Sequence, residues 1–269
     1  MNWQAGFTRG RPGLWRWGAP LLVWALAALL AGCGQAPAGA AQDTDTLTQV
    51  STYPALQRGQ FGGETTFAQL AQRGDFGLGT FDGLDGEMIA LDGVFYQATA
   101  DGAVRVADKA LTTPFADVSF FHSSQQLTIS QPLQSLDELK AFLGKQLPSA
   151  NRPYAFKISG TFPYLKFRSV PRQAAPYPTL AAAVGKQKVF EQQNLSATLV
   201  GYMLPDYLGT IGVAGYHFHM ISADRQRGGH VLDVRVADAT VDIDYLGNVD
   251  LVIPQNATFQ GTNFATPLP

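Results

Sequence analysis

The sequence predicts an α+β fold with mostly antiparallel or mixed β-sheets and a few helices. Short stretches rich in β-branched and aromatic residues recur between glycine, aspartate and asparagine residues, which is typical of strands separated by turns. The sequence shows no internal repeat and no long helical periodicity. Because strands predominate and do not alternate regularly with helices, the pattern favours α+β architecture over a parallel α/β sheet.

The first predicted strands form a hairpin over residues 89–97. Asp92-Gly93 lies there between apolar residues, and this dipeptide favours the type I′ turn that joins antiparallel strands. The remaining strands are predicted at 118–121, 154–159, 164–170, 196–202, 230–236 and 240–244.

Three helices are predicted between these strands. A short one covers residues 66–73, and a second begins at the capping box formed by Ser135 and Glu138. The apolar residues of this second helix share one face: Leu136, Leu139, Phe142 and Leu143. The third covers residues 177–187, where alanines favour a helix.

A domain boundary is expected near residue 170. Pro171 and Pro176 interrupt the strand pattern there. We therefore expect an N-terminal β-sheet domain over 47–170 and a C-terminal domain over 171–269. The roughly 220 residues involved suffice for one large domain or two small ones.

The N-terminus has the layout of a secretory signal. Three arginines and no acidic residue precede an apolar run at 19–30, and a secretory signal has such a basic segment before an apolar stretch of ~7 to 15 residues. The run is too short for a confident spanning helix, which needs roughly 20 apolar residues.

The run ends in Leu30-Ala31-Gly32-Cys33, which resembles the bacterial lipoprotein processing box. In that box the cysteine becomes the lipid-modified first residue of the mature protein. We therefore expect a signal peptide at 1–32, a flexible tether at 33–46, and export to the periplasmic or extracellular face of the cell envelope, with anchoring through Cys33. An ordinary secretory signal with an incidental cysteine is the alternative.

Cysteine count and charge exclude two further possibilities. Cys33 is the only cysteine, so no intramolecular disulfide can form and no thiolate is available elsewhere. The chain has 19 basic and 21 acidic residues, and removal of residues 1–32 would take away three arginines, which leaves 16 against 21 and a net charge of about −5. Nucleic acid is therefore not an expected partner.

Three of the four histidines fall within a short segment and predict a metal site. In a strand over 215–221, a period of two places His217 and His219 on one face. A polar, glycine-ended turn at 224–229 follows, so a hairpin brings His230 about opposite His219. Three neutral imidazoles suit zinc with a fourth position left for water or substrate, although nickel, copper, cobalt or iron would accept the same ligands.

The pair His217 and His219 also fits a second pattern, and the fourth histidine lies apart from the other three. An HxH pair also occurs in cupin barrels, whose motif continues with a glutamate a few residues later. Ala223 and Asp224 occupy those positions here, so the cupin interpretation is weak. The fourth histidine, His122, follows a mostly apolar stretch and is predicted to be structural.

Three separated motifs, in order, resemble bacterial alpha-acetolactate decarboxylase. They are GTFDGLDGEMIALDGVFYQ at 79–97, KFRSVPRQ at 166–173 and GYHFHMISADRQRGGHVLD at 215–233. The resemblance runs from about residue 56 to residue 254. It implies a two-domain α/β arrangement, subunits that pair as a homodimer through the N-terminal sheet, and conversion of 2-acetolactate to acetoin and carbon dioxide.

The resemblance also implies roles for individual residues. Zinc would be held by His217, His219 and His230, with Glu87 and Arg168 as the catalytic residues. Thr80 matches a threonine that lines the substrate pocket. The chemistry agrees, because a Lewis-acidic ion can take up the electrons left by decarboxylation, an arginine can pair with the substrate carboxylate, and a carboxylate can move a proton.

The sequence departs from the family at its C-terminal end. The resemblance implies a second glutamate near the zinc pocket, but no acidic residue follows Asp250. Glu87 and water could suffice, another acid could reach the pocket, or activity could be lost. A zinc-binding lipoprotein that binds a small hydroxy-keto acid without turnover is therefore the alternative function, and a related lyase with a larger substrate is a third.

Overall fold

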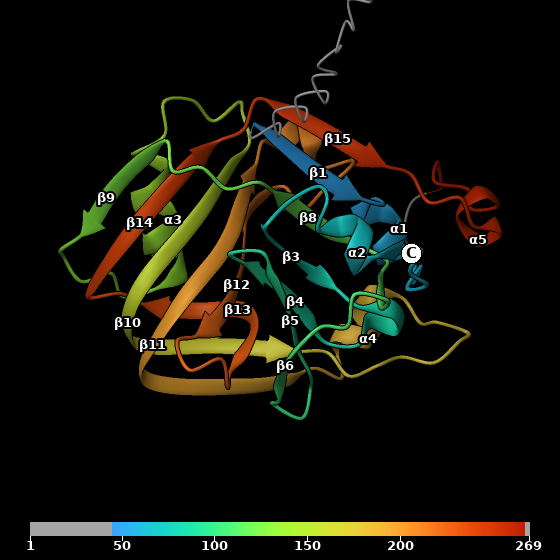
Figure 1. Ribbon diagram of the computed structural model, residues 1–269, viewed down its shortest axis with the longest axis horizontal. Helices are drawn as coiled ribbons and strands as arrows, with labels where there is room; N and C mark the ends of the chain where they lie inside the picture. The colour runs from blue at the N-terminus through green and yellow to red at the C-terminus, as the bar shows by residue number, and fades with distance from the viewer. Residues whose placement is uncertain (1–44, 267–269) are drawn as a thin grey trace, which may run out of the picture. The chain divides into compact units, whose positions relative to one another are not determined.

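Two large β-sheets make up most of the structure, a computed structural model that describes residues 45–266 (Figure 1). The seven-stranded sheet has the order β15 (Asn248–Val252), β1 (Thr46–Val50), β8 (Ala116–Ser119), β3 (Phe76–Thr80), β4 (Glu87–Leu91), β5 (Val94–Ala98) and β6 (Val104–Val106). The six-stranded sheet has the order β11 (Lys188–Leu204), β12 (Gly215–Ser222), β13 (Gly228–Arg235), β10 (Tyr154–Ser169), β14 (Asp238–Tyr245) and β9 (Gln125–Ile129). A short ladder joins β2 (Thr65–Thr66) to β7 (Thr112–Thr113).

The predicted hairpin at 89–97 is confirmed as β4 and β5. Leu91 pairs with Val94, and the two residues between them have positive φ angles, 52° for Asp92 and 79° for Gly93. A type I′ turn requires positive φ at both central positions, and its twist matches that of the flanking strands. This hairpin places Glu87 at the start of β4.

The predicted strands at 154–159 and 164–170 are one continuous strand, β10. It pairs along its whole length with β11, except that Pro163 and the facing Asn194 are skipped. Proline has no N–H to donate, and Asn194 has a φ of 51°, so the ladder is locally interrupted without ending the strand. Because β10 pairs with both β11 and β13, the strands β10 to β13 form a closed ring of hydrogen-bonded neighbours.

The helices are short, and each begins at a residue that caps it. They are α1 (Tyr53–Gln57), α2 (Phe67–Leu70), α3 (Leu136–Gly144), α4 (Leu180–Val184) and α5 (Ala257–Gln260), with 3₁₀ turns at Asp82–Leu84 and Asp206–Leu208. Ser135 accepts from the Glu138 N–H at α3 as predicted, but the Glu138 carboxylate accepts from the Gln134 N–H instead of from the cap itself. The reciprocal capping box occurs at α2, between Thr66 and Gln69.

A shared apolar core joins the two sheets. Leu78 and Ile89 of the seven-stranded sheet belong to the same buried cluster as Val200 and Ile221 of the six-stranded sheet. Tyr202 adds a polar link, because its buried hydroxyl donates to the carbonyl oxygen of Phe76 at 3.0 Å. Residues on one sheet can therefore form a site with residues on the other.

The two sheets do not meet at the domain boundary expected near residue 170, because each contains strands from both sides of it. β9 and β10 precede that boundary but hydrogen bond with β11, β13 and β14, which follow it. β15, near the C-terminal end of the described residues, belongs to the seven-stranded sheet and pairs in parallel with β1. Arg168, expected in the N-terminal domain, therefore lies in the six-stranded sheet.

The N-terminal predictions fall outside the described residues. The signal peptide, the tether up to residue 44 and the lipidation site Cys33 all lie there. Among the helices of residues 45–266, none has the length and apolarity needed to cross a membrane.

Candidate metal and substrate site

The three clustered histidines lie on neighbouring strands of the six-stranded sheet. His217 and His219 are two residues apart on β12, so their side chains leave the same face. The turn after Ser222 returns the chain into β13, and His230 is the direct cross-strand partner of His219. The predicted hairpin and its register are therefore confirmed.

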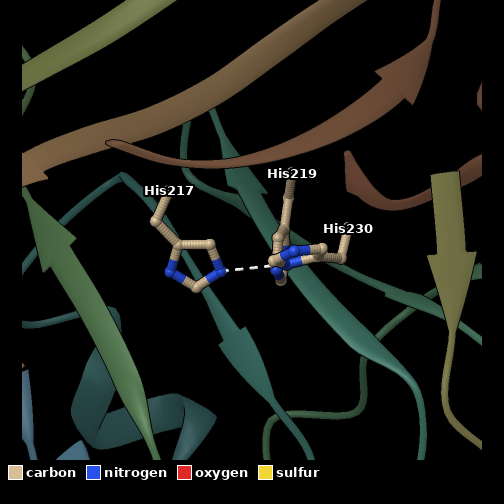
Figure 2. A group of neighbouring side chains, drawn as sticks. All are labelled: His217, His219 and His230. Carbon is tan, nitrogen blue, oxygen red and sulfur yellow. Dashed lines mark hydrogen bonds between the residues drawn. The ribbon is translucent and has the colours of Figure 1, made fainter. Parts of the chain in front are cut away.

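Their ring nitrogens converge on one point (Figure 2). The candidate ligand atoms all lie within 4.8 Å of one another, and His217 Nε2 is 3.1 Å from His230 Nδ1. His219 Nδ1 donates to the carbonyl oxygen of Met88 at 2.8 Å, because a carbonyl oxygen can only accept. This bond fixes the tautomer of His219 and leaves its Nε2 lone pair free to bind a cation.

The surroundings of the histidines keep them neutral. Burial lowers the pKa of His217 to about 3, and the positive charge of Arg168 acts in the same direction. Burial also lowers the pKa of His219 and His230 well below the usual value. Neutral imidazole is the form that binds metals, so the cluster is ready to do so at neutral pH.

The donor set fits a divalent transition-metal ion. The Nδ1 atom of His217 is buried and has no hydrogen-bond partner among the described residues. The Nε2 atom of His217 and the Nδ1 atom of His230 face each other, an arrangement that a shared proton or a common cation satisfies. Three imidazoles with no thiolate suit zinc, copper, nickel or iron more than calcium or magnesium.

Glu87 and Arg168 adjoin the histidines from opposite sheets. Glu87 Oε2 is 3.6 Å from His219 Nε2, and Glu87 Oε1 is 3.4 Å from Arg168 Nη1. Burial raises the pKa of Glu87, whereas Arg168 lowers it. Arg168 on β10 is the cross-strand partner of His230 on β13, which explains why a cation and an imidazole lie side by side in this part of the sheet.

Two hydrogen bonds hold the end of β10 against the seven-stranded sheet. The buried Ser169 hydroxyl donates to the carbonyl oxygen of Ala98 at 2.8 Å, and the Gly86 N–H donates to the carbonyl oxygen of Val170 at 3.0 Å. Glu87 directly follows Gly86 in the chain, and Arg168 directly precedes Ser169. The bonds therefore fix the position of the acid relative to the arginine.

Thr80 lies beside Glu87 as its cross-strand partner. Its hydroxyl donates to the carbonyl oxygen of Gly86 at 2.7 Å, which leaves oxygen lone pairs but no further proton to offer. The structure thus brings together all six residues that the sequence suggested for the site: Thr80, Glu87, Arg168, His217, His219 and His230.

These residues line one cavity of about 110 Å³. Its other walls are mostly apolar and are made by residues that the sequence did not individually suggest for the site: Tyr53, Leu56, Gly79, Leu84, Phe115, Val170, Leu180 and Val213. A cavity of about 150 Å³ takes up benzene, so the space suits a small molecule. Apolar residues on short helices and loops have no local pattern that marks them as pocket walls.

The structural role predicted for His122 and the second glutamate implied by the resemblance can be compared with the residues that line the cavity. His122 is absent from its lining, and the His122 N–H donates to Asp244 Oδ2 at 2.9 Å, in keeping with a structural role. Within residues 45–266, Glu87 is the only acidic residue that lines the cavity, and no residue after His230 lines it. The C-terminal segment instead contacts the region of Glu64, which accepts from the Gln255 N–H.

The fold and the site define a two-sheet α+β protein with a buried tri-histidine cluster that could hold a metal ion, beside an acid and an arginine. A sequence model described as alpha-acetolactate decarboxylase matches residues 47–266. The chain belongs to the alpha-acetolactate decarboxylase family.

Proteins of known sequence and structure agree with this assignment. The chain is 48% identical over 202 residues to an alpha-acetolactate decarboxylase of Methanosarcina mazei. The aligned residues cover 74% of this chain and 70% of the relative. It is 41% identical to the enzyme of that name from Methylococcus capsulatus, over 81% of this chain and 83% of the relative. The crystal structure of alpha-acetolactate decarboxylase from Bacillus subtilis strain 168 superimposes with a TM-score of 0.80 at 35% identity, over 82% of this chain and 94% of that one.

Proposed function

We propose that the protein is a zinc-dependent enzyme that decarboxylates 2-acetolactate to acetoin and carbon dioxide. The observation that carries the proposal is the convergence of three neutral histidines, Glu87 and Arg168 in one small cavity of a chain that belongs to this family. His217, His219 and His230 would hold the ion. Bound there, zinc supplies a Lewis acid for the substrate oxygens.

Arg168 binds and orients the substrate carboxylate. Its guanidinium offers parallel donors that match the two carboxylate oxygens, a geometry that lysine does not provide. The bond between the carboxylate carbon and C2 then breaks, carbon dioxide leaves, and the electron pair moves toward the ketone oxygen. Arg168 stabilises the negative charge that collects on the oxygens.

Glu87 moves the proton that completes the reaction. One proton must be added to carbon for each carbon dioxide released, and burial raises the pKa of Glu87, which favours the protonated form that can donate it. Arg168 pairs with the Glu87 carboxyl group, and the hydrogen bond from Ser169 to Ala98 fixes the strand end that carries Arg168. The Glu87 carboxyl group therefore lies on one side of the cavity. It should deliver the proton to one face of the substrate carbon, so a single acetoin enantiomer is expected.

An acetoin assay tests this proposal. Protein loaded with zinc is expected to form acetoin from racemic 2-acetolactate well above the spontaneous rate. His217→Ala should abolish both metal binding and turnover, while the matched control His122→Ala, outside the cavity, should keep both. Acetoin formation at the spontaneous rate by fully metallated protein would contradict the proposal.

The alternative is a protein that binds zinc and a small hydroxy-keto acid without turnover. It is favoured by one observation, that Glu87 is the only acid lining the cavity within the described residues. Tight ligand binding by calorimetry together with no product would support it.

We also propose that Cys33 carries a lipid that anchors the exported protein to the cell envelope, and that the protein is a homodimer. The lipoprotein processing box supports the anchor, and Cys33→Ala should move the protein from the membrane fraction to the soluble fraction. β15 at the end of the seven-stranded sheet, with exposed Val249, supports pairing of two copies. Light scattering at the mass of one chain would contradict the dimer.

A further inference from the structure

His230 is the member of the tri-histidine cluster that reaches the site from a different strand. His217 and His219 lie on β12, whereas His230 lies on β13. The cluster therefore forms only while these two strands keep the observed register, in which His219 lies opposite His230. A slip of one residue would turn the His230 side chain to the other face of the sheet, because successive side chains of a strand alternate between its faces.

The ladder between β12 and β13 is short and carries few side chains that could select its register. Beyond the histidine pair, it joins Met220 to Gly229 and Ile221 to Gly228. Glycine has no side chain to pack against a neighbour, so glycine-rich strands specify their pairing only weakly. The register beside the metal site must therefore be fixed by something other than this ladder.

The ladder on the other edge of β13 is interrupted close to the histidine. Arg168 of β10 pairs with His230. The register of these two strands then shifts between Lys166 and Phe167. A bulge of this kind lets two stretches of one ladder pair at different offsets. The stretch beside His230 is thus short on both edges of β13, and the turn that leads into the strand becomes the nearest constraint.

The fully buried hydroxyl of Ser222 organises that turn. It donates to Asp224 Oδ1 at 2.5 Å. It accepts from the Arg227 N–H at 2.9 Å and from the Gln226 N–H at 3.2 Å. Asp224 Oδ1 also accepts from the Gln226 N–H, at 3.0 Å. One hydroxyl and one carboxylate oxygen thus connect the last residue of β12 to the two residues that precede β13.

The backbone of the turn needs such contacts to keep its shape. The Ser222 N–H donates to the carbonyl oxygen of Arg227, and the Ser222 carbonyl oxygen accepts from the Arg225 N–H, both at 2.9 Å. Arg225 has a φ of 60°, a conformation that is unfavourable for residues other than glycine. Without the Ser222 hydroxyl, the N–H groups of Gln226 and Arg227 lose an acceptor, and the turn is free to relax into other conformations.

We propose that Ser222 and Asp224 are positioning residues that set the register of β13 and thereby hold His230 in the metal site. This inference rests on the proposed binding of zinc by the three histidines. It concerns two residues that do not line the cavity. If the native register were populated in only about one-tenth of the molecules, the apparent Kd for zinc would rise about tenfold.

Zinc affinity, measured by competition with a chelator, tests the inference without any substrate. Ser222→Ala and Asp224→Ala each remove an acceptor from the turn and should raise the Kd for zinc by about tenfold or more. Asp224 is exposed, so its variants should fold. Asp224→Asn keeps an acceptor oxygen in place and should stay within about twofold of the wild-type Kd.

The matched control is Ser119→Ala. It removes another fully buried serine hydroxyl, which is hydrogen bonded to the Tyr202 hydroxyl at 3.0 Å, and it should lower stability without changing the Kd for zinc. The inference is overturned if Ser222→Ala and Asp224→Ala bind zinc like the wild type, if Ser119→Ala binds it as weakly as they do, or if Asp224→Asn is as weak as Asp224→Ala.

Nuclear magnetic resonance of the metal-free protein reports on the register itself. The cross-strand backbone NOE between His219 and His230 should weaken in Ser222→Ala and Asp224→Ala, whereas the NOE between Phe156 of β10 and Gly201 of β11 should not change. Weaker zinc binding with an unchanged NOE between the histidines would overturn the inference, because the register would then be intact. Wild-type protein that binds zinc without forming acetoin would contradict the proposed decarboxylation alone, since neither measurement involves substrate.

Discussion

The Glu87–Arg168 pair is the part of the site whose removal has the most direct energetic consequence. The two side chains are only 8% and 14% exposed, and their charged atoms are 3.4 Å apart. Coulomb's law at an effective dielectric constant of about 20 gives an attraction of about 5 kcal/mol at this distance. Loss of one partner from such a buried pair costs about 3–5 kcal/mol, because the remaining charge has lost its counterion.

Arg168→Met should therefore lower the free energy of unfolding of metal-free protein by about 3–5 kcal/mol at pH 8. Arg168 lowers the pKa of Glu87, so the variant's Glu87 should have a pKa even further above its value in the unfolded chain. A carboxyl group whose folded pKa is raised destabilises the folded state at high pH, and this penalty disappears as pH falls and the group is protonated. The loss should consequently shrink toward pH 5.

A double-mutant cycle measured by urea unfolding isolates this effect. In a Glu87→Gln background no charge is left unpaired, so Arg168→Met should cost only about 1 kcal/mol, and the coupling between the two changes should be about 2–4 kcal/mol. Additive losses, or a loss that does not change between pH 8 and pH 5, would refute the reasoning. Arg168→Lys should retain the stability but lose most of kcat/KM, because lysine keeps the charge without the bidentate geometry.

Two further predictions concern one residue in each large sheet, Asp117 of β8 and Gly229 of β13. Burial raises the pKa of Asp117 to about 7, so the folded state binds its proton more tightly than the unfolded chain does, and this aspartate lowers the free energy of unfolding progressively as pH rises from about 4 to 7. Asp117→Asn should then stabilise the protein by on the order of 2–4 kcal/mol at pH 8 and by almost nothing at pH 4, as measured by urea unfolding, and an effect independent of pH would argue against it. A Cβ at Gly229 would lie 2.4 Å from the carbonyl oxygen of Arg168, so Gly229→Ala should push β13 from β10, weaken metal binding at His230 and cost about 1–3 kcal/mol, whereas unchanged zinc affinity by competition with a chelator would contradict this.

The histidine cluster could be predicted from the sequence because its determinants are local. A period of two sets the shared face of His217 and His219, and a glycine-ended turn of short length sets the register of His230. Glu87 and Arg168 had no such pattern. They were suggested by motif resemblance alone, because their meeting depends on the packing of one sheet against the other.

Long-range pairings and apolar walls could not be predicted in this way. β15 joins β1 in parallel, with Thr46 opposite Asn248, and nothing in either segment specifies so distant a partner. Two strands were predicted at 154–159 and 164–170, but the structure has one, since a long ladder tolerates the single missing donor at Pro163. Leu180 and Val213 looked like ordinary apolar residues, because they become cavity walls only where α4 and the loop before β12 come together with strands of both sheets.

Acetoin formation is expected to depend on one metal ion held by the tri-histidine cluster. The most direct measurement is a titration of chelator-stripped protein with zinc, in which bound metal and the rate of acetoin formation are followed together. Bound zinc and the rate should rise in parallel and level off at one zinc per chain, and His219→Ala should show neither. Full activity in the stripped protein, or zinc-dependent activity that survives His219→Ala, would contradict it.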